Sequence, residues 1–250
     1  MTAGAPPAAT NPFDAWADLL PLWGRFADDV DIPFYGRLAT EHGRPSVELG
    51  IGYGRVARQV APDFGVDASG VMLERAAHCA PTTQLIRSDL RAYVLPEPAR
   101  FSYAPLNTFD GITGDEALHA VLARVREQTV PGGHLAFDGE LPDPALGGAT
   151  RRIVRLAGID RTNAIFATHD VVDAGSGEVE ITVFVDYLDA SGDVLRRRYF
   201  PPMPYRARCA EQWEAVLGAT GWEVVARWGG FAGEQLTGSE GRQVWLARRA

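Results

Sequence analysis

Two acidic residues stand beside glycine-rich or strand-ending segments early in the chain, where they could bind a cationic ligand. Glu48 begins a turn that contains Gly50, Gly52 and Gly54, and Asp67 ends the next apolar segment. Glycines at the end of a strand let the backbone turn sharply and approach a ligand closely. A carboxylate in this turn would repel a pyrophosphate but suits a ligand that carries an ammonium and a sulfonium. An acid at the end of a second strand is typical of a ribose-binding group.

Short apolar segments alternate with helical patterns over most of the chain and would position these acids. Predicted strands are 45–49, 64–67, 84–88, 101–104, 134–138, 222–227 and 242–247, and predicted helices are 55–60, 71–80, 116–128 and 211–219. Strands that alternate with helices at this spacing predict a doubly wound, mostly parallel α/β sheet.

A single domain with an insertion fits the 250 residues better than two independent domains. Residues 149–158 are expected to be helical, and turns at 175–177 and 191–192 predict three antiparallel strands, 164–172, 178–188 and 194–200. The predicted parts are a disordered leader (1–11), a helical lid (12–43), a cofactor-binding half (44–142), an antiparallel insertion that roofs the substrate (143–208) and a C-terminal helix with strands (209–250).

Composition argues against several classes of function. The net charge of −8 and the scattered arginines disfavour a nucleic-acid partner. The chain contains no lysine, which excludes Schiff-base catalysis by a lysine amine. Cys79 and Cys209 lie outside any CxxC pattern and predict a reducing compartment, the cytoplasm. No membrane span, signal peptide or metal-ligand spacing is evident, so we expect no membrane partner and no metal.

Taken together, five motifs resemble those of the class I S-adenosylmethionine-dependent methyltransferases. Residues 48–54 resemble their E/D-x-G-x-G-x-G, and residues 66–73 are similar to their G-V-D-x-S-x-x-M-L string. Residues 88–90, 131–133 and 217–224 resemble their G-D-M/L, P-G-G and L-x-x-A-G-F-x-V elements. The resemblance implies a seven-stranded Rossmann-like sheet and methyl transfer from S-adenosylmethionine to a small molecule. Residues 105–109 and the insertion further resemble the natural-product branch.

The resemblance also implies a role for each matching residue. Glu48 would hold the amino group of the methionine part, Gly50 and Gly52 would leave backbone room, and Asp67 would accept from the ribose hydroxyls. The other implied cofactor contacts are Ala68, Met72 against the adenine, Asp89 and Leu90 at its edge, Pro105 and Leu106 along the methionine part, and Tyr35 from the lid.

Methyl transfer from a sulfonium mainly requires alignment of the nucleophile, the methyl group and the sulfur. A base is needed only if the nucleophile carries a proton at neutral pH. Asp138 and His169 are the candidate catalytic residues, with Glu140 as another possible base. Asp138 is preferred among them, although it could instead be a turn or cap residue. Trp23, Phe34 and Phe109 are candidates for an aromatic substrate wall.

Several alternatives stay open at the level of sequence. A nicotinamide-dependent oxidoreductase is disfavoured because Arg55 stands where the dinucleotide fingerprint needs a third glycine. A methyltransferase-like protein with lost or changed activity is the other alternative. Residues 228–233 replace an acidic string of the family, which predicts a different substrate. The accepting atom (O, N or C) is open, and the insertion could be a substrate roof, a homodimer contact or both.

Overall fold

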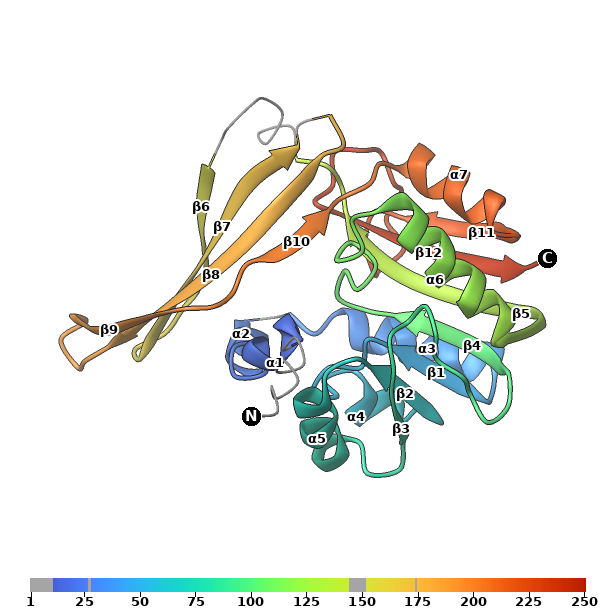
Figure 1. Ribbon diagram of the computed structural model, residues 1–250, viewed down its shortest axis with the longest axis horizontal. Helices are drawn as coiled ribbons and strands as arrows, with labels where there is room; N and C mark the ends of the chain where they lie inside the picture. The colour runs from blue at the N-terminus through green and yellow to red at the C-terminus, as the bar shows by residue number, and fades with distance from the viewer. Residues whose placement is uncertain (1–10, 27, 144–151, 174) are drawn as a thin grey trace, which may run out of the picture.

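The computed structural model describes residues 11–26, 28–143, 152–173 and 175–250 of the chain. Its largest element is a seven-stranded sheet with the strand order β11-β12-β5-β4-β1-β2-β3 (Figure 1). The strands are β1 (Ser46–Leu49), β2 (Phe64–Asp67), β3 (Gln84–Arg87), β4 (Ala99–Ala104), β5 (Thr129–Glu140), β11 (Trp222–Trp228) and β12 (Arg242–Arg249). Strands β1 to β5 are parallel, and β12 runs antiparallel between β5 and β11. The expected mostly parallel α/β fold is confirmed.

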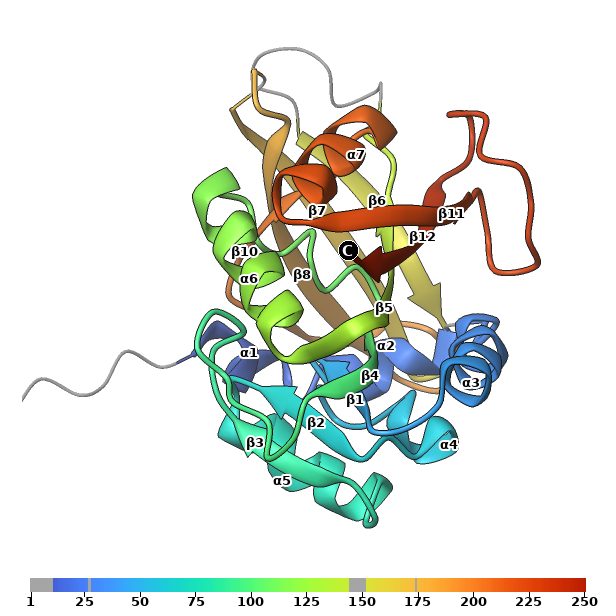
Figure 2. The ribbon, with the colours of Figure 1, turned by 90° about the vertical axis from the view of Figure 1, so that its right-hand side faces the viewer.

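Helices cover both faces of this sheet, as Figure 2 shows. On one face, α6 (Asp115–Glu127) and α7 (Ala210–Ala219) pack on the main core, which contains Phe137, Trp213 and Trp245. On the other face, α3 (Asp31–His42) packs on β4, β5 and β12 through a second buried cluster. Two further helices, α4 (Ala57–Val60) and α5 (Gly70–Cys79), follow β1 and β2. The alternation of strands and helices therefore predicted the layers correctly.

The insertion forms a second, antiparallel sheet of five strands rather than three. These are β6 (Arg152–Ile159), β7 (Asn163–Asp173), β8 (Glu178–Leu188), β9 (Val194–Tyr199) and β10 (Met203–Arg206). The helix expected at 149–158 is wrong for the described residues from 152 on, because they form β6, which pairs antiparallel with β7. Residues 149–151 lie outside the described part of the chain. Tertiary pairing here overrides local helix propensity.

The N-terminal segment lies between the two sheets (Figure 1). It consists of α1 (Pro12–Trp16), α2 (Leu20–Trp23) and a 3₁₀ turn, Gly24–Phe26. Asp18 bridges its neighbours, since it pairs with Arg75 of α5 at 2.6 Å and with Arg198 of β9 at 3.2 Å. The expected leader lies outside the described residues except for Asn11, which accepts a hydrogen bond from the Phe13 amide at 3.0 Å. No helix among the described residues has the length and apolar character needed to cross a membrane.

Candidate functional site

The glycine turn lies at the carboxyl end of β1, where ligands bind in open α/β sheets. Gly50, Gly52 and Gly54 have φ values of 68°, 55° and 85°, a region that favours glycine. The turn is also tightly packed: a Cβ added at Gly50 would lie 2.7 Å from the Thr108 side chain, and one at Gly54 would lie 3.2 Å from Cys79 Cβ. Both conformation and space therefore require glycine at Gly50 and Gly54.

Asp67 joins this turn to the start of α5. Its Oδ2 accepts a hydrogen bond from the Gly52 amide at 2.9 Å, and its Oδ1 accepts one from the Ser69 amide at 2.8 Å. Burial raises the pKa of Asp67 despite these hydrogen bonds. The neighbouring Ala68 is exposed. The carboxylate is thus fixed by backbone donors at the junction of the first two strands.

Glu48 lies beneath the turn, on the face covered by α3. It is 1% exposed, and its Oε2 accepts a hydrogen bond from the Tyr103 hydroxyl at 2.9 Å. Burial raises the pKa of Glu48 to about 8, although the hydrogen bond from Tyr103 opposes this. The acid is therefore close to the turn but enclosed.

Tyr35 and Asp138 form a second tyrosine–carboxylate pair beside the first. The Tyr35 ring stacks on Tyr103 with 5.3 Å between ring centroids, and its hydroxyl donates to Asp138 Oδ1 at 2.6 Å. Tyr35 is fully buried on α3, so the expectation that it closes over a ligand from the lid is wrong.

Asp138 holds a turn rather than facing an open site. Besides Tyr35, it accepts hydrogen bonds from the amides of Leu106 at 3.0 Å and Asn107 at 3.2 Å. These two residues have positive φ values of 57° and 56°, so the turn after β4 depends on this anchor. Asp138 is 3% exposed, and burial raises its pKa to about 6. A carboxylate with three donors and almost no accessible surface does not fit the expected role of general base.

The other expected cofactor residues surround the same edge of the sheet. Leu106 is 52% exposed directly after Pro105, at the end of β4. Met72 lies in the first turn of α5 and is buried against the N-terminal helices, with Trp16 and Leu19 in the same cluster. Leu90 packs on the main core. The Asp89 carboxylate is exposed and bound to Arg91 at 2.6 and 2.8 Å, so it would have to share or exchange this partner to bind an adenine.

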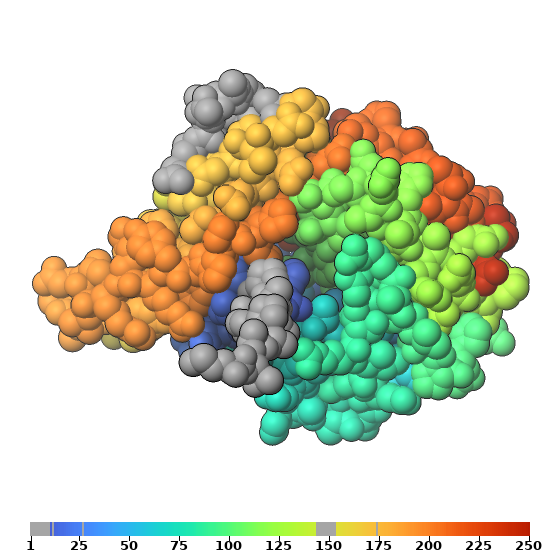
Figure 3. Space-filling model, viewed as in Figure 1, coloured from blue at the N-terminus to red at the C-terminus, as the bar shows by residue number. Residues whose placement is uncertain are grey.

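The lid is fastened over the start of α5. Ser69 Oγ donates to Asp14 at 2.5 Å, and Trp16 Nε1 donates to the Pro201 carbonyl at 2.8 Å. Trp23 is half-buried beside Trp16, in the cluster that also contains inward-facing residues of the second sheet. Figure 3 shows this face of the molecule hollowed between the N-terminal helices and the two sheets. Trp23 remains a candidate wall residue.

Two of the expected substrate contacts belong to the core instead. Phe34 is 3% exposed and packs against Trp228 and Phe231 on α3's face of the sheet. Phe109 is fully buried against Phe137 and Trp213 on the opposite face. Neither ring has surface to offer a substrate, so these two expectations are wrong.

A cluster of polar residues that the sequence did not predict to be neighbours lies at the ends of β4 and β5. Asn107 Nδ2 lies 3.4 Å from Glu140 Oε1, and Tyr205 of β10 donates to Asp110 at 3.0 Å. The candidate His169 lies on β7 of the second sheet and is half-buried. Asp110 and Tyr205 were not foreseen, because residues 95 positions apart meet only through the fold of the second sheet.

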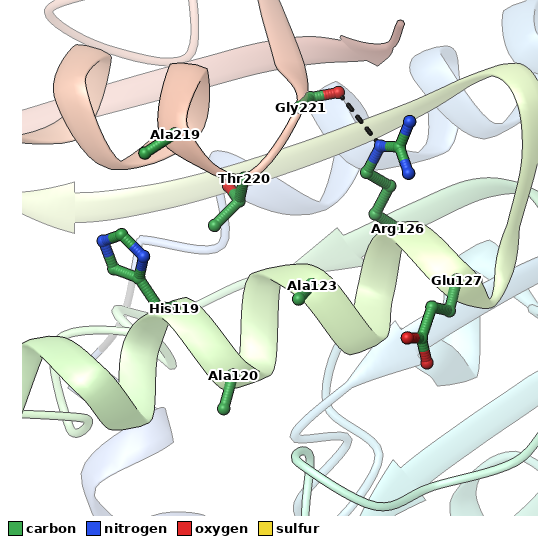
Figure 4. A pocket seen from close by; sticks show the side chains of 8 residues that line it. All are labelled: His119, Ala120, Ala123, Arg126, Glu127, Ala219, Thr220 and Gly221. Carbon is green, nitrogen blue, oxygen red and sulfur yellow. Dashed lines mark hydrogen bonds between the residues drawn. The ribbon is translucent and has the colours of Figure 1, made fainter.

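An open groove of about 590 Å³ lies elsewhere, between α6 and the end of α7 (Figure 4). Its walls are mainly small side chains, with Arg126 donating to the Gly221 carbonyl at 3.3 Å across it. It contains none of the candidate site residues. Among the described residues, no group of three potential metal ligands occurs.

The fold has counterparts among solved structures, whereas no family model and no curated protein sequence matches the chain. The CcbJ methyltransferase from Streptomyces caelestis is 23% identical with a TM-score of 0.80, covering 96% of this chain and 98% of that one. An S-adenosylmethionine-dependent methyltransferase from Clostridium acetobutylicum is 16% identical (TM-score 0.75; 95% and 99% covered). CalS10 from Micromonospora echinaspora, an amino pentose methyltransferase solved with bound S-adenosylmethionine, is 20% identical (TM-score 0.65; 91% and 92% covered). The chain therefore has the fold of the S-adenosylmethionine-dependent methyltransferases.

Proposed function

We propose that this chain is an enzyme that transfers the methyl group of S-adenosylmethionine to a small-molecule acceptor of the natural-product type. The observation that carries the proposal is the contact between Asp67 and the Gly52 amide at the carboxyl edge of the sheet. This contact joins the glycine turn to the acid that would bind the ribose. Glu48 lies enclosed below them and does not carry the proposal.

The chain's residues would hold the cofactor and align its methyl group. Asp67 would bind the ribose, Gly50 and Gly52 would let the backbone approach, and Leu106 would line the methionine part. When bound, the cofactor supplies an electrophilic methyl group on a positively charged sulfur. The acceptor would then enter from the lid and the second sheet, and alignment supplies most of the rate acceleration.

The geometry also argues against the nicotinamide alternative. A dinucleotide site places a pyrophosphate at the N-terminus of a helix that follows the glycine turn. Here that helix, α4, has four residues, and Arg55 before it is held by Asp31 in a buried ion pair. The antiparallel β12 between β5 and β11 is a further departure from the parallel dinucleotide-binding order.

Titration calorimetry with S-adenosylhomocysteine tests the proposal. We expect micromolar binding by the wild-type chain. Asp67→Ala should weaken it at least tenfold, because a hydrogen bond to a charged group contributes about 1.5–3 kcal/mol. Asp193→Ala, in the exposed turn before β9, should bind like the wild type. Absence of binding by the wild type would refute the proposal, and NADH binding by the same protein would favour the oxidoreductase. A chain that binds the cofactor but transfers no methyl group would favour the alternative of lost activity.

We further propose a homodimer through the outer face of the second sheet. One row across four strands is apolar, Leu156–Phe166–Phe184–Tyr199. Leu156 and Tyr199 are 54% and 63% exposed, which is unusual for a row of this length on a monomer's surface. The flanking Arg197 is paired with Asp186 at 2.6 Å, so this face is locally neutral on a chain of net charge −8. Two acidic copies repel least on such a face.

Sedimentation equilibrium tests the dimer. We expect a mass of two chains for the wild type and of one chain for Tyr199→Glu and Leu156→Glu, because each would place a charge in the apolar contact. Val94→Glu is the matched control: Val94 is 64% exposed in the segment between β3 and β4, so this substitution should leave the dimer intact. A monomeric wild type, or dimers in all variants, would contradict the proposal.

The location in the cytoplasm likewise remains a proposal, supported by two free cysteines, Cys79 and Cys209.

A further inference from the structure

A small pocket lies at the amino edge of the seven-stranded sheet, where β4 and β5 begin. It has a volume of about 200 Å³ and is lined by Glu41, His42, Arg100, His134 and the turn 130–133. Between two successive paired positions of β4 and β5, the four residues of this turn stand opposite Arg100 alone, which makes a bulge. The pocket lies at the opposite edge of the sheet from the glycine turn, so it takes no part in the proposed function.

Two histidine rings form one wall of this pocket. His42, the last residue of α3, stacks on His134 with 3.9 Å between the ring centroids and 21° between the ring planes. The His42 ring also packs on Phe101, with 5.6 Å between centroids. The Nε2 atom of His42 is buried and has no hydrogen-bond partner within the described part of the chain. Since buried polar atoms are nearly always hydrogen-bonded, this nitrogen needs a partner from outside the described residues.

Arg100 brings a permanent positive charge to the same pocket. Its side chain lies against the end of α3, because a Cβ added at Gly43 would be 3.9 Å from Arg100 Cδ. Among the described residues, the guanidinium has no ion-pair or hydrogen-bond partner. Glu41, which also lines the pocket, is paired with Arg37 at 3.7 Å. A guanidinium without a partner beside two imidazoles is a local excess of positive charge on a chain of net charge −8.

The stacking of the two rings suits an oxoanion better than a metal ion. The nitrogens of an imidazole bind in the plane of the ring, and two nearly parallel planes do not meet near the rings. Both nitrogens therefore cannot lie about 2.0–2.1 Å from one metal ion. A tetrahedral anion has several oxygens and can accept from each ring in that ring's own plane, and from the guanidinium as well.

A doubly charged anion in the pocket would favour protonated rings. Burial lowers the pKa of His42 and of His134, so both rings are neutral near pH 7 when nothing is bound. Besides Arg100, the charged groups that face them are Glu41, which raises the pKa of both, Arg37, which lowers that of His42, and Arg248, which lowers that of His134. A bound dianion would raise both pKa values, so binding takes up protons and must weaken as the pH rises.

We propose that this pocket binds a tetrahedral dianion, either free phosphate or the phosphate group of a small molecule, between Arg100, His42 and His134. The guanidinium supplies the permanent charge, and each protonated ring donates a hydrogen bond. The contact between Tyr35 and Asp138 joins α3 to β5 at the carboxyl edge of the sheet. The bound anion joins the same two elements at the amino edge and fastens α3 to the sheet there.

Calorimetric titration of the cofactor-free chain with sulfate tests the site, because sulfate stays doubly charged between pH 6 and 8. We expect binding at pH 6 to be at least tenfold tighter than at pH 8, since each proton taken up contributes up to about tenfold per pH unit. Arg100→Gln should weaken binding at pH 6 at least tenfold, because it removes a charged donor. Arg161→Gln, which changes an exposed arginine between β6 and β7, is the matched control and should bind like the wild type.

NMR signals of the five histidine rings locate the anion. His42→Asn and His134→Asn assign the two signals of the pocket by their loss. Sulfate should shift both signals in the wild type and leave that of the exposed His119 in place. Inorganic phosphate and phenyl phosphate, compared at pH 6.5, distinguish the two sources of the dianion. Tighter binding of phenyl phosphate would indicate a phosphorylated small molecule, and tighter binding of phosphate the free ion.

Three results would overturn the inference. These are a wild type that does not bind sulfate, equal binding at pH 6 and pH 8, and binding that Arg100→Gln leaves unchanged. The first two are measured on the wild type and do not depend on the folding of a variant. Arg100 is exposed, so its replacement should leave the fold intact, which circular dichroism verifies.

Discussion

Asp138 illustrates how a single acid in a candidate site can serve structure rather than chemistry. Its three hydrogen bonds join α3, the turn after β4 and the end of β5. Asp138→Ala would leave the buried Tyr35 hydroxyl and two part-buried amides without acceptors. Each unsatisfied buried group costs about 1–3 kcal/mol, so we expect the free energy of unfolding to fall by at least about 2 kcal/mol. Urea denaturation followed by circular dichroism measures this.

The control for Asp138→Ala is Asp193→Ala, which should change the free energy of unfolding by less than about 0.5 kcal/mol because Asp193 is exposed. Asp138→Asn should lie between the two, since the amide oxygen can still accept from the turn. A loss below 0.5 kcal/mol in Asp138→Ala would mean that the turn does not depend on this residue, and the role of general base would be open again.

At the scale of elements, a buried ion pair ties α3 to the helix that follows the glycine turn. Arg55 donates to Asp31 Oδ1 at 2.9 Å, and the two residues are 7% and 6% exposed. Breaking a buried pair by removing one partner costs about 3–5 kcal/mol, because the remaining charge is uncompensated. Asp31→Ala should therefore destabilise the chain strongly, and Arg55→Met combined with Asp31→Leu should cost less than Asp31→Ala alone.

A double-mutant cycle measured by urea denaturation checks this expectation. The pair is independent of ligand, so the cycle is run without cofactor. Additive effects of the two single substitutions would show that Arg55 relies on its second partner, Asp29, at 2.8 Å, rather than on Asp31. In that case Asp29→Ala should carry the larger loss.

The helices and strands also show which parts of the fold and of the site could be predicted from the sequence. Hydrophobic periodicity and turn residues predicted the strands of the first sheet and the helices that cover it, because each of those elements has a strong local pattern. They failed at β6, whose pairing with β7 overrides its helical pattern. In the site, the spacing of glycines and acids predicted the turn and Asp67. It could not predict the orientation of Phe34, Phe109 or Tyr35, since apolar and aromatic rings at helical spacing pack equally well on a core or a ligand.

The polar contacts of the site that the sequence did not predict form between segments far apart in the chain. Glu48 meets Tyr103 because β1 and β4 pair in a register that places these residues opposite each other. Asp110 meets Tyr205 because β10 returns to the loop after β4, where the Arg206 amide donates to the Asp110 carbonyl at 2.8 Å. No local pattern encodes a register between strands 55 residues apart. Such polar partners can be found from sequence only when the sheet order and register are known.

For the whole molecule, the buried acids and histidines set an unusual dependence of stability on pH. Burial raises the pKa of Glu48 and Asp110 to about 8, well above the ordinary values of 4.5 and 3.8. The folded chain therefore holds protons that the unfolded chain releases, and the free energy of unfolding falls as pH rises from about 4.5 to 8. Burial lowers the pKa of His42 and His134, which stack with ring centroids 3.9 Å apart, so they destabilise the fold as pH falls below 6.5.

These two effects oppose each other below pH 6.5, but only the acids titrate between pH 6.5 and 8. We therefore expect the free energy of unfolding of the cofactor-free chain to decrease by at least about 1 kcal/mol from pH 6.5 to 8.5, since one proton contributes about 1.4 kcal/mol per pH unit. Urea denaturation across this range measures it. Glu48→Gln should reduce the slope to about half, because the amide cannot ionise while Asp110 still titrates, whereas the exposed Glu127→Gln should leave it unchanged. A slope of zero in the wild type would mean that neither buried acid holds its proton at neutral pH, and Glu48 would then be charged before any cation binds above it.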